Sequence, residues 1–68
     1  MTVTTYERAQ RNAAIIREIE KAGWRISTTY AHGNHLITLR RAPTTIRWSH
    51  PDRLDWEGAY DAWKEQQS

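Results

Sequence analysis

In the first third of the chain, apolar residues recur every three or four positions, which is the spacing of one helix face. Thr4, three residues before Glu7, has the form of an N-terminal capping box. Gly23 stands where a residue in the left-handed conformation would end the helix. The pattern predicts a helix over about residues 5–22. Its apolar face would consist of Tyr6, Ala9, Ala13, Ile16 and Ile19, widened by Ile15 and Ala22.

From Trp24 the apolar period changes to two, as in strands that bury one face. Two such runs flank Gly33-Asn34, which we interpret as the two-residue loop of a β-hairpin. The register that follows pairs His32 with His35, Tyr30 with Ile37 and Thr28 with Leu39. One face would then carry Trp24, Ile26, Thr28, Tyr30, Ile37 and Leu39, and the other Arg25, Ser27, Thr29, Ala31, Leu36, Thr38 and Arg40.

The rest of the chain predicts a third strand and a second helix. Ala42-Pro43 ends the second strand, and residues 44–49 form a third in which Arg47 faces outward and Ile46 and Trp48 face the core. Ser49 or Asp52 would cap the helix that follows, whose apolar stripe is Trp56, Ala59, Tyr60 and Trp63. We therefore expect one α+β domain over residues 1–68, in which two helices pack on one face of a three-stranded antiparallel sheet in the order α-β-β-β-α.

Charge is distributed unevenly along this chain. Residues 1–51 carry a net charge of +5 and residues 52–68 a net charge of −3, which suggests a polyanionic partner for the basic part. Ordinary solubility charge is the alternative. The absence of cysteine and of long apolar runs favours a soluble, cytoplasmic protein without membrane contact. A core this small is often supplemented by self-association, so a homodimer is a further expectation.

The open face of the predicted sheet is the first candidate site. Arg25, Arg40 and Arg47 would share it with the hydroxyl groups of Ser27, Thr29, Thr38 and Thr45. Arginines and hydroxyls together suit contacts to nucleic-acid phosphates. The face has no aromatic side chain on which a base could stack. A solvated sheet face without a ligand is the alternative.

Three histidines form the second candidate site. His32 and His35 flank the predicted turn, and His50 follows the third strand. An exposed turn histidine could act as general acid or base in phosphodiester transfer, with a nearby arginine stabilising the developing charge. A zinc site would need other ligand spacing, so we expect no metal and no other cofactor. Plain polar turn residues are the third interpretation.

The aromatic stripe of the second helix has two interpretations. Trp56, Tyr60 and Trp63 at helical spacing are typical of a core-facing stripe. On an acidic helix they could instead form a partner-binding surface, as in a small inhibitor or accessory protein of a phage or mobile element.

Two short runs are notable, Glu20-Lys21-Ala22-Gly23-Trp24 at the end of the first helix and Gly33-Asn34-His35-Leu36-Ile37 at the turn. They resemble the HicA (YcfA-like) toxin family, which has serine in place of Asn34. The resemblance implies a double-stranded-RNA-binding-like fold, mRNA endoribonuclease activity and neutralisation by a HicB antitoxin. It implies that His35 is catalytic, that Gly33 shapes the turn and that Trp24 packs beneath.

The leading hypothesis is therefore a small RNA-directed domain that acts as a metal-independent endoribonuclease toxin. His35 would be catalytic, and the nucleic acid would be held by Arg25, Arg40, Arg47, Gly33 and Asn34. Two alternatives stay open: a non-catalytic DNA- or RNA-binding regulator, and a module that binds a protein partner.

Overall fold

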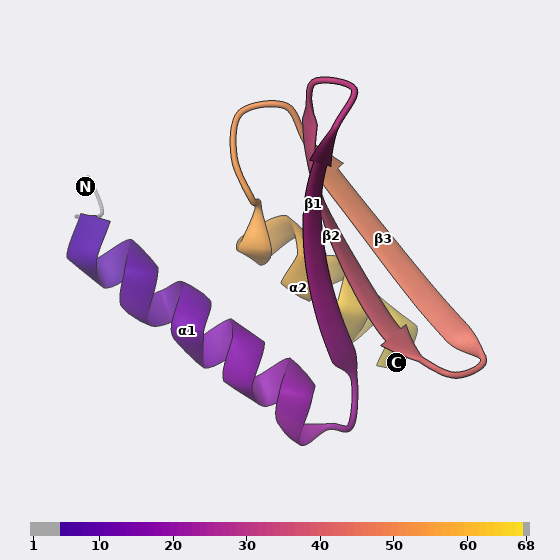
Figure 1. Cartoon of the computed structure of the whole chain (residues 1–68). Helices are drawn as coiled ribbons and strands as arrows, with labels where there is room; N and C mark the ends of the chain where they lie inside the picture. Colours follow the sequence, from indigo (N-terminus) through magenta and orange to yellow (C-terminus); the bar gives the residue numbers. More distant parts are fainter. Residues whose placement is uncertain (1–4, 68) are drawn as a thin grey trace.

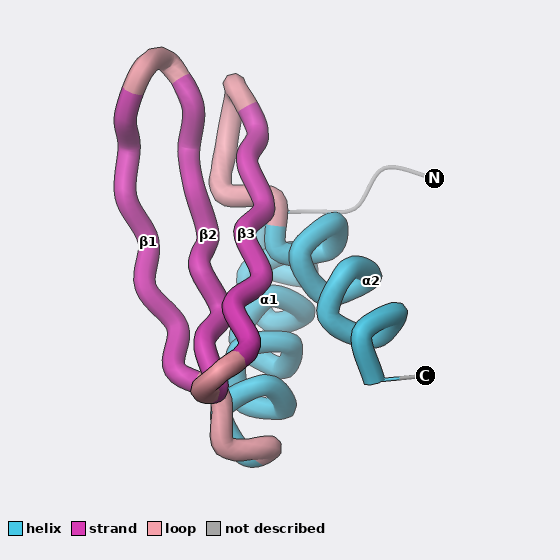
Figure 2. Tube along the Cα trace, turned by 90° about the vertical axis from the view of Figure 1, so that its right-hand side faces the viewer, coloured by secondary structure: helices cyan, strands magenta, loops and turns pink. Residues whose placement is uncertain are grey.

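The computed structural model describes residues 5–67, and it confirms the element order α-β-β-β-α. The strands form one antiparallel sheet in the order β1-β2-β3. Both helices lie on the same side of this sheet, and its other face is bare (Figures 1 and 2). The elements are α1 (Thr5–Lys21), β1 (Arg25–Ala31), β2 (Asn34–Arg41), β3 (Thr44–His50) and α2 (Trp56–Gln67).

Helix α1 ends as predicted, but only the second half of its predicted apolar face is buried. Gly23 has a φ of 92°, and the Trp24 N–H donates to the Ile19 carbonyl at 3.3 Å, which ends the helix. Only Ile15 and Ile19 are buried, whereas Tyr6 is 71% exposed, so the predicted stripe through Tyr6, Ala9 and Ala13 is wrong. The first half of α1 runs away from the sheet and has no strand to pack on (Figure 1). Thr4, the predicted cap, lies outside the described residues.

The β1–β2 hairpin differs from the predicted register by two residues. Its loop is His32-Gly33, with φ values of 54° and 80°, because a type I′ turn needs positive φ at both central positions. Asn34 pairs with Ala31, and its side-chain amide donates to the His32 carbonyl at 3.4 Å. The predicted pairs His32–His35, Tyr30–Ile37 and Thr28–Leu39 are therefore wrong, and the observed pairs are Tyr30–His35, Thr28–Ile37 and Ile26–Leu39.

A shift of two residues leaves every strand side chain on its predicted face, because side chains alternate with a period of two. Ile37 and Leu39 are fully buried under the helices, while Arg25 and Arg40 are exposed on the open face. The third strand is confirmed, with Arg47 exposed and Ile46 and Trp48 half-buried. The core consists of Ile15, Ile19, Trp24, Ile37, Leu39, Ala59 and Trp63.

Helix α2 is capped by Asp55, and the prediction of Ser49 or Asp52 is wrong. One carboxylate oxygen of Asp55 accepts the Gly58 N–H at 3.3 Å, which is the N-cap spacing. The other accepts the Trp48 indole N–H at 3.0 Å, so the cap also ties α2 to β3. Gly58 packs so closely on Trp48 and Asp55 that a Cβ atom would overlap both side chains. The start of α2 is therefore held against the sheet by one carboxylate and one glycine.

Polar contacts join the helices to each other. The Tyr60 hydroxyl donates to Glu18 at 2.7 Å, and Arg11 forms an ion pair with Glu57 at 2.9 Å. Among residues 5–67, no helix has the length and apolar character needed to cross a membrane.

Candidate nucleic-acid interface

Both helices lie on one side of the sheet, and its other side is open (Figure 2). Because strand side chains alternate between the two sides, every second residue of each strand faces this open side. The strand pairing arranges them in rows across β1, β2 and β3. Arginine and hydroxyl side chains dominate these rows, and Leu36 is the one large apolar member. The rows are Arg25–Arg40–Thr45, Ser27–Thr38–Arg47 and Thr29–Leu36–Ser49.

The open face is strongly cationic. Arg25 lies directly opposite Arg40 on neighbouring strands, and Arg47 is on the next row of β3. The three strands, all within the described part of the chain, contain no Asp or Glu, and none of these three arginines has an ion-pair partner among residues 5–67. Like charges directly opposite each other in a sheet destabilise it. An anion bound between Arg25 and Arg40 would remove that repulsion.

A shallow hollow of about 310 Å³ marks the end of the sheet where Arg25 and Arg40 lie opposite each other. Its wall includes Arg41, which was not among the residues predicted to bind nucleic acid. By alternation Arg41 belongs to the other face, but it is the last residue of β2 and its Nε lies close to Gly23 at the sheet end. Its position next to Arg40, directly before a proline turn, was the signal that could have identified it. The hollow is lined by Gly23, Arg25, Arg40, Arg41 and Ala42.

The structure separates the predicted catalytic histidine from the predicted phosphate-binding arginines. His35 is half-buried on the helix-facing side of the sheet, whereas Arg25, Arg40 and Arg47 lie on the open face. A single sheet layer lies between the two groups. An arginine on the open face therefore cannot stabilise the charge on a phosphate in a reaction that uses His35 as general acid or base.

His35 instead has histidine and tyrosine neighbours. Its ring lies 4.7 Å from that of Tyr30, and His50 is its direct partner across β2 and β3. The Nδ1 atom of His50 accepts the Asp52 N–H at 3.1 Å, so a neutral His50 carries its proton on Nε2. His32 occupies the turn itself, near Asn34. Within residues 5–67, no group of three or more His, Asp or Glu side chains is arranged to hold a metal ion.

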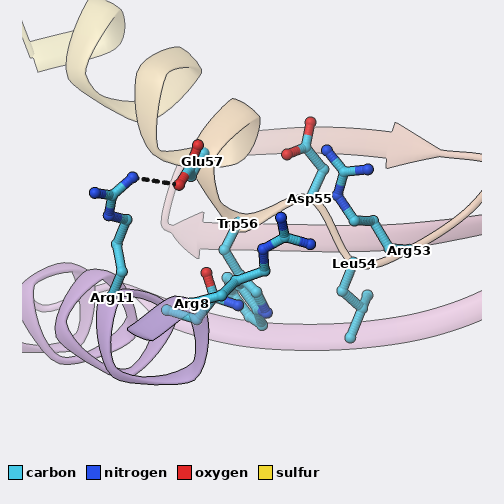
Figure 3. Close-up of a pocket in the computed structure, with 8 residues that line it drawn as sticks. Arg8, Arg11, Arg53, Leu54, Asp55, Trp56 and Glu57 are labelled. Atoms are coloured by element: carbon cyan, nitrogen blue, oxygen red, sulfur yellow. Dashed lines mark hydrogen bonds and ion pairs between the residues drawn. The ribbon is translucent and has the colours of Figure 1, made fainter. Parts of the chain in front are cut away.

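A second basic hollow, of about 350 Å³, lies between the first half of α1 and the start of α2 (Figure 3). Arg8, Arg11 and Arg53 line it together with Asp55 and Glu57. Glu57 already pairs with Arg11, and Arg53 lies near Asp55, so carboxylates offset much of the positive charge. This groove is therefore a weaker anion site than the open face of the sheet.

The electrostatics of Asp55 follow from its role as a cap. Partial burial would raise the pKa of this carboxyl group, but several interactions with its charged form act in the opposite direction. The hydrogen bonds from Trp48 and the Gly58 backbone, with the electrostatic effect of nearby Arg53 and, to a smaller extent, of His50, hold the pKa below its ordinary value. Asp55 is thus charged at neutral pH and has a structural task.

The three aromatic residues predicted as an alternative partner-binding surface, Trp56, Tyr60 and Trp63, differ in their exposure. Trp63 is buried, 6% exposed, with its ring 6.4 Å from that of Trp24 in an edge-to-face arrangement. It cannot contact a partner while the domain is folded, so its assignment to a partner surface is wrong. Trp56 and Tyr60 are half-buried and pack against the core, and a partner contact through their exposed parts stays a prediction.

Comparisons with protein-family models, curated proteins and solved structures give no match for this chain.

Proposed function

We propose that this protein is a small RNA-binding domain that contacts phosphates with the open face of its sheet. The observation that carries the proposal is the direct opposition of Arg25 and Arg40 in a sheet whose strands contain no acidic residue. Such a pair is unfavourable in the free protein, because like charges across a sheet repel. A phosphate between the two guanidinium groups turns the repulsion into two charge-assisted hydrogen bonds.

The remaining side chains of the face support backbone contacts rather than base reading. Ser27, Thr45 and Ser49 are exposed hydroxyls that can donate to phosphate oxygens. Tyr and Trp side chains of the strands all lie on the helix-facing side, so no ring is available on the open face to stack a base. Binding should therefore depend little on nucleotide sequence. RNA is proposed over DNA because of the resemblance to the HicA family.

The test is fluorescence anisotropy with labelled RNA of mixed sequence. Arg40→Ala should weaken binding by a similar factor for every sequence, and it should reduce the slope of log affinity against log salt by about 0.7 to 1. Arg17→Ala is the matched control, because Arg17 is an exposed arginine of α1 and lies on the helix side of the molecule. Equal losses in both variants, or binding that is independent of salt, would overturn the proposal. Tighter binding to duplex DNA of the same sequence would mean that the open face binds nucleic acid but that DNA, not RNA, is the ligand.

A second candidate activity, RNA cleavage at His35, is favoured by one observation. His35 and His50 are direct neighbours across two strands, and paired imidazoles can serve as general base and general acid in one phosphodiester transfer. The arginines of the open face would play no part in this reaction. Purified protein should cleave RNA in the presence of EDTA, and His35→Ala and His50→Ala should each abolish cleavage while leaving RNA affinity intact. Intact RNA after incubation with the wild-type protein would eliminate this candidate.

A further inference from the structure

The two edges of the sheet differ in their surroundings. In β1, every residue except Ile26 is exposed, and β1 is the outermost element on its side of the molecule (Figure 2). Helix α2 packs against β2 and β3, whereas α1 packs against β1 and α2. Neither of these helices lies beyond the outer edge of β1 (Figure 2). Within the described residues, β1 pairs only with β2, so its other row of backbone N–H and C=O groups is unpaired.

The β1 edge lacks the features by which proteins usually prevent edge pairing. Such features are a charged residue within the strand, a proline or a bulge. Arg25 stands at the very start of β1, and the six residues after it are uncharged. They are Ile26, Ser27, Thr28, Thr29, Tyr30 and Ala31, a sequence rich in β-branched and aromatic side chains.

The hairpin geometry decides which backbone groups of β1 point outward. In a type I′ hairpin with the loop His32-Gly33, the flanking residues Ala31 and Asn34 exchange hydrogen bonds with each other. Because the pattern alternates along an antiparallel pair, the N–H and C=O groups that point away from β2 belong to Ile26, Thr28 and Tyr30.

We propose that a second copy of this chain pairs with the β1 edge in antiparallel register, with the two-fold axis at Thr28. In this register Ile26 lies opposite Tyr30 of the other copy, and Thr28 lies opposite its own equivalent. Tyr30, which is 63% exposed, would cover the half-buried Ile26 of the other copy. Arg25 would face Ala31, so no like charges meet across the dimer edge.

The β3 edge does not permit the same symmetric arrangement. By the same alternation, the outward groups of β3 belong to Thr45, Arg47 and Ser49. A two-fold axis at the centre of this edge would place Arg47 directly opposite its own equivalent, and like charges so placed are repulsive. The central arginine therefore protects β3 from self-pairing and leaves β1 as the dimer edge.

The pairing is independent of the proposed RNA-binding function but has a consequence for it. Two sheets joined edge to edge about an axis perpendicular to the sheet present both open faces on the same side. Arg25, Arg40 and Arg47 of both copies would then form one continuous surface. Loss of the dimer should weaken RNA binding, whereas Arg40→Ala should weaken RNA binding and leave the dimer intact.

The experiment is a measurement of mass by light scattering after size exclusion, from micromolar to millimolar protein. The wild-type protein should have twice the chain mass of 8.0 kDa. Thr28→Pro should reduce the mass to that of one chain, because proline blocks the outward edge without removing a hydrogen bond to β2. Thr45→Pro is the matched control: the same change on the outward side of β3 should leave the dimer intact. The proposal would be overturned if the wild-type protein had the mass of one chain at all concentrations. It would also be overturned if the Thr45→Pro variant were monomeric while the Thr28→Pro variant remained a dimer.

A charge pair at the same position covers the case in which Thr28→Pro disturbs the fold. Thr28→Lys and Thr28→Glu should each be monomeric at low salt, because each would place like charges opposite each other at the axis. An equimolar mixture of the two variants should regain the dimer mass. A mixture that stays monomeric would contradict pairing at Thr28, since a merely structural role of Thr28 gives no such rescue.

Discussion

The two faces of the sheet come from the same three strands and differ in almost every property. On the helix-facing side, Ile37 and Leu39 are completely buried against α1 and α2. On the open side, their chain neighbours Thr38 and Arg40 face solvent among other arginines and hydroxyls. The strand period of two keeps these sets apart although they alternate in the chain. Stability and ligand binding should therefore respond to different, directly adjacent residues.

The largest expected effect contrasts Ile37 with Thr38. Ile37→Ala removes a fully buried side chain from the central strand and should cost about 2–5 kcal/mol of unfolding free energy, close to the whole stability of a domain this small. Thr38→Ala should cost no more than about 1 kcal/mol, because the half-buried Thr38 lies on the open face and the change mainly reduces strand propensity. Urea denaturation followed by circular dichroism measures both. Similar losses in the two variants would mean that the open face is covered in solution.

Gly58→Ala should also act on the helix-facing side, with a sign opposite to helix propensity. Alanine is usually favoured over glycine inside a helix by about 1 kcal/mol. Here the new Cβ would overlap Trp48 and Asp55, so we expect a loss of about 1–3 kcal/mol. The same substitution in a Trp48→Phe background should cost less, because the smaller ring frees the space. A stabilised Gly58→Ala protein would show that α2 does not pack closely on β3.

Substitution of Asp55, the cap of α2, should reduce the unfolding free energy by a smaller amount, and this loss should depend on pH. Asp55 has a lowered pKa in the folded state, so its stabilising effect is present above the ordinary value of 3.8 and is lost as the pH falls through the folded value. Asp55→Asn offers one acceptor oxygen for two donors and should lose about 1 kcal/mol at neutral pH. The difference in unfolding free energy between the variant and the wild-type protein, measured by urea denaturation, should become smaller at acidic pH. A constant difference across the acid range would contradict this role.

The smallest expected effect is an increase in stability, caused by a substitution on the open face. Arg40→Gln removes one member of the like-charged pair with Arg25 and should raise the unfolding free energy by about 0.2–1 kcal/mol at low salt. Added salt should reduce this gain, because it screens the repulsion in the wild-type protein. The same variant should bind RNA more weakly. A loss of stability would mean that the two guanidinium groups do not repel each other in the free protein.

The division into two faces was predictable from the sequence, because it depends only on the alternation of side chains along each strand. The hairpin register was not, since it depends on which residue adopts positive φ first. Gly33-Asn34 and His32-Gly33 are both two-residue loops, and a histidine at φ 54° is an uncommon choice. The structure uses glycine at the second central position of the turn and returns Asn34 to the ladder.

The errors in the helices have tertiary causes. The periodicity of α1 extends to Tyr6, but burial also requires a surface opposite, and the sheet does not reach that far (Figure 1). Ser49 and Asp52 have suitable side chains for a cap, but the helix starts later, at the point where one Asp55 carboxylate reaches both Trp48 and Gly58. The separation of His35 from the arginines could also have been predicted from the sequence. Side chains alternate between the two sides of each strand, and this alternation already places His35 on the side opposite Arg25, Arg40 and Arg47.

The most direct test of the central claim is an NMR titration of the protein with RNA that follows the arginine Nε–Hε signals. Two arginine sets are available in one molecule, Arg25, Arg40 and Arg47 on the open face and Arg8, Arg11 and Arg53 in the groove between the helices. We expect the signals of the first set to shift progressively with added RNA and those of the second to remain in place. Shifts confined to Arg8, Arg11 and Arg53 would contradict the assignment of the open sheet face as the nucleic-acid interface.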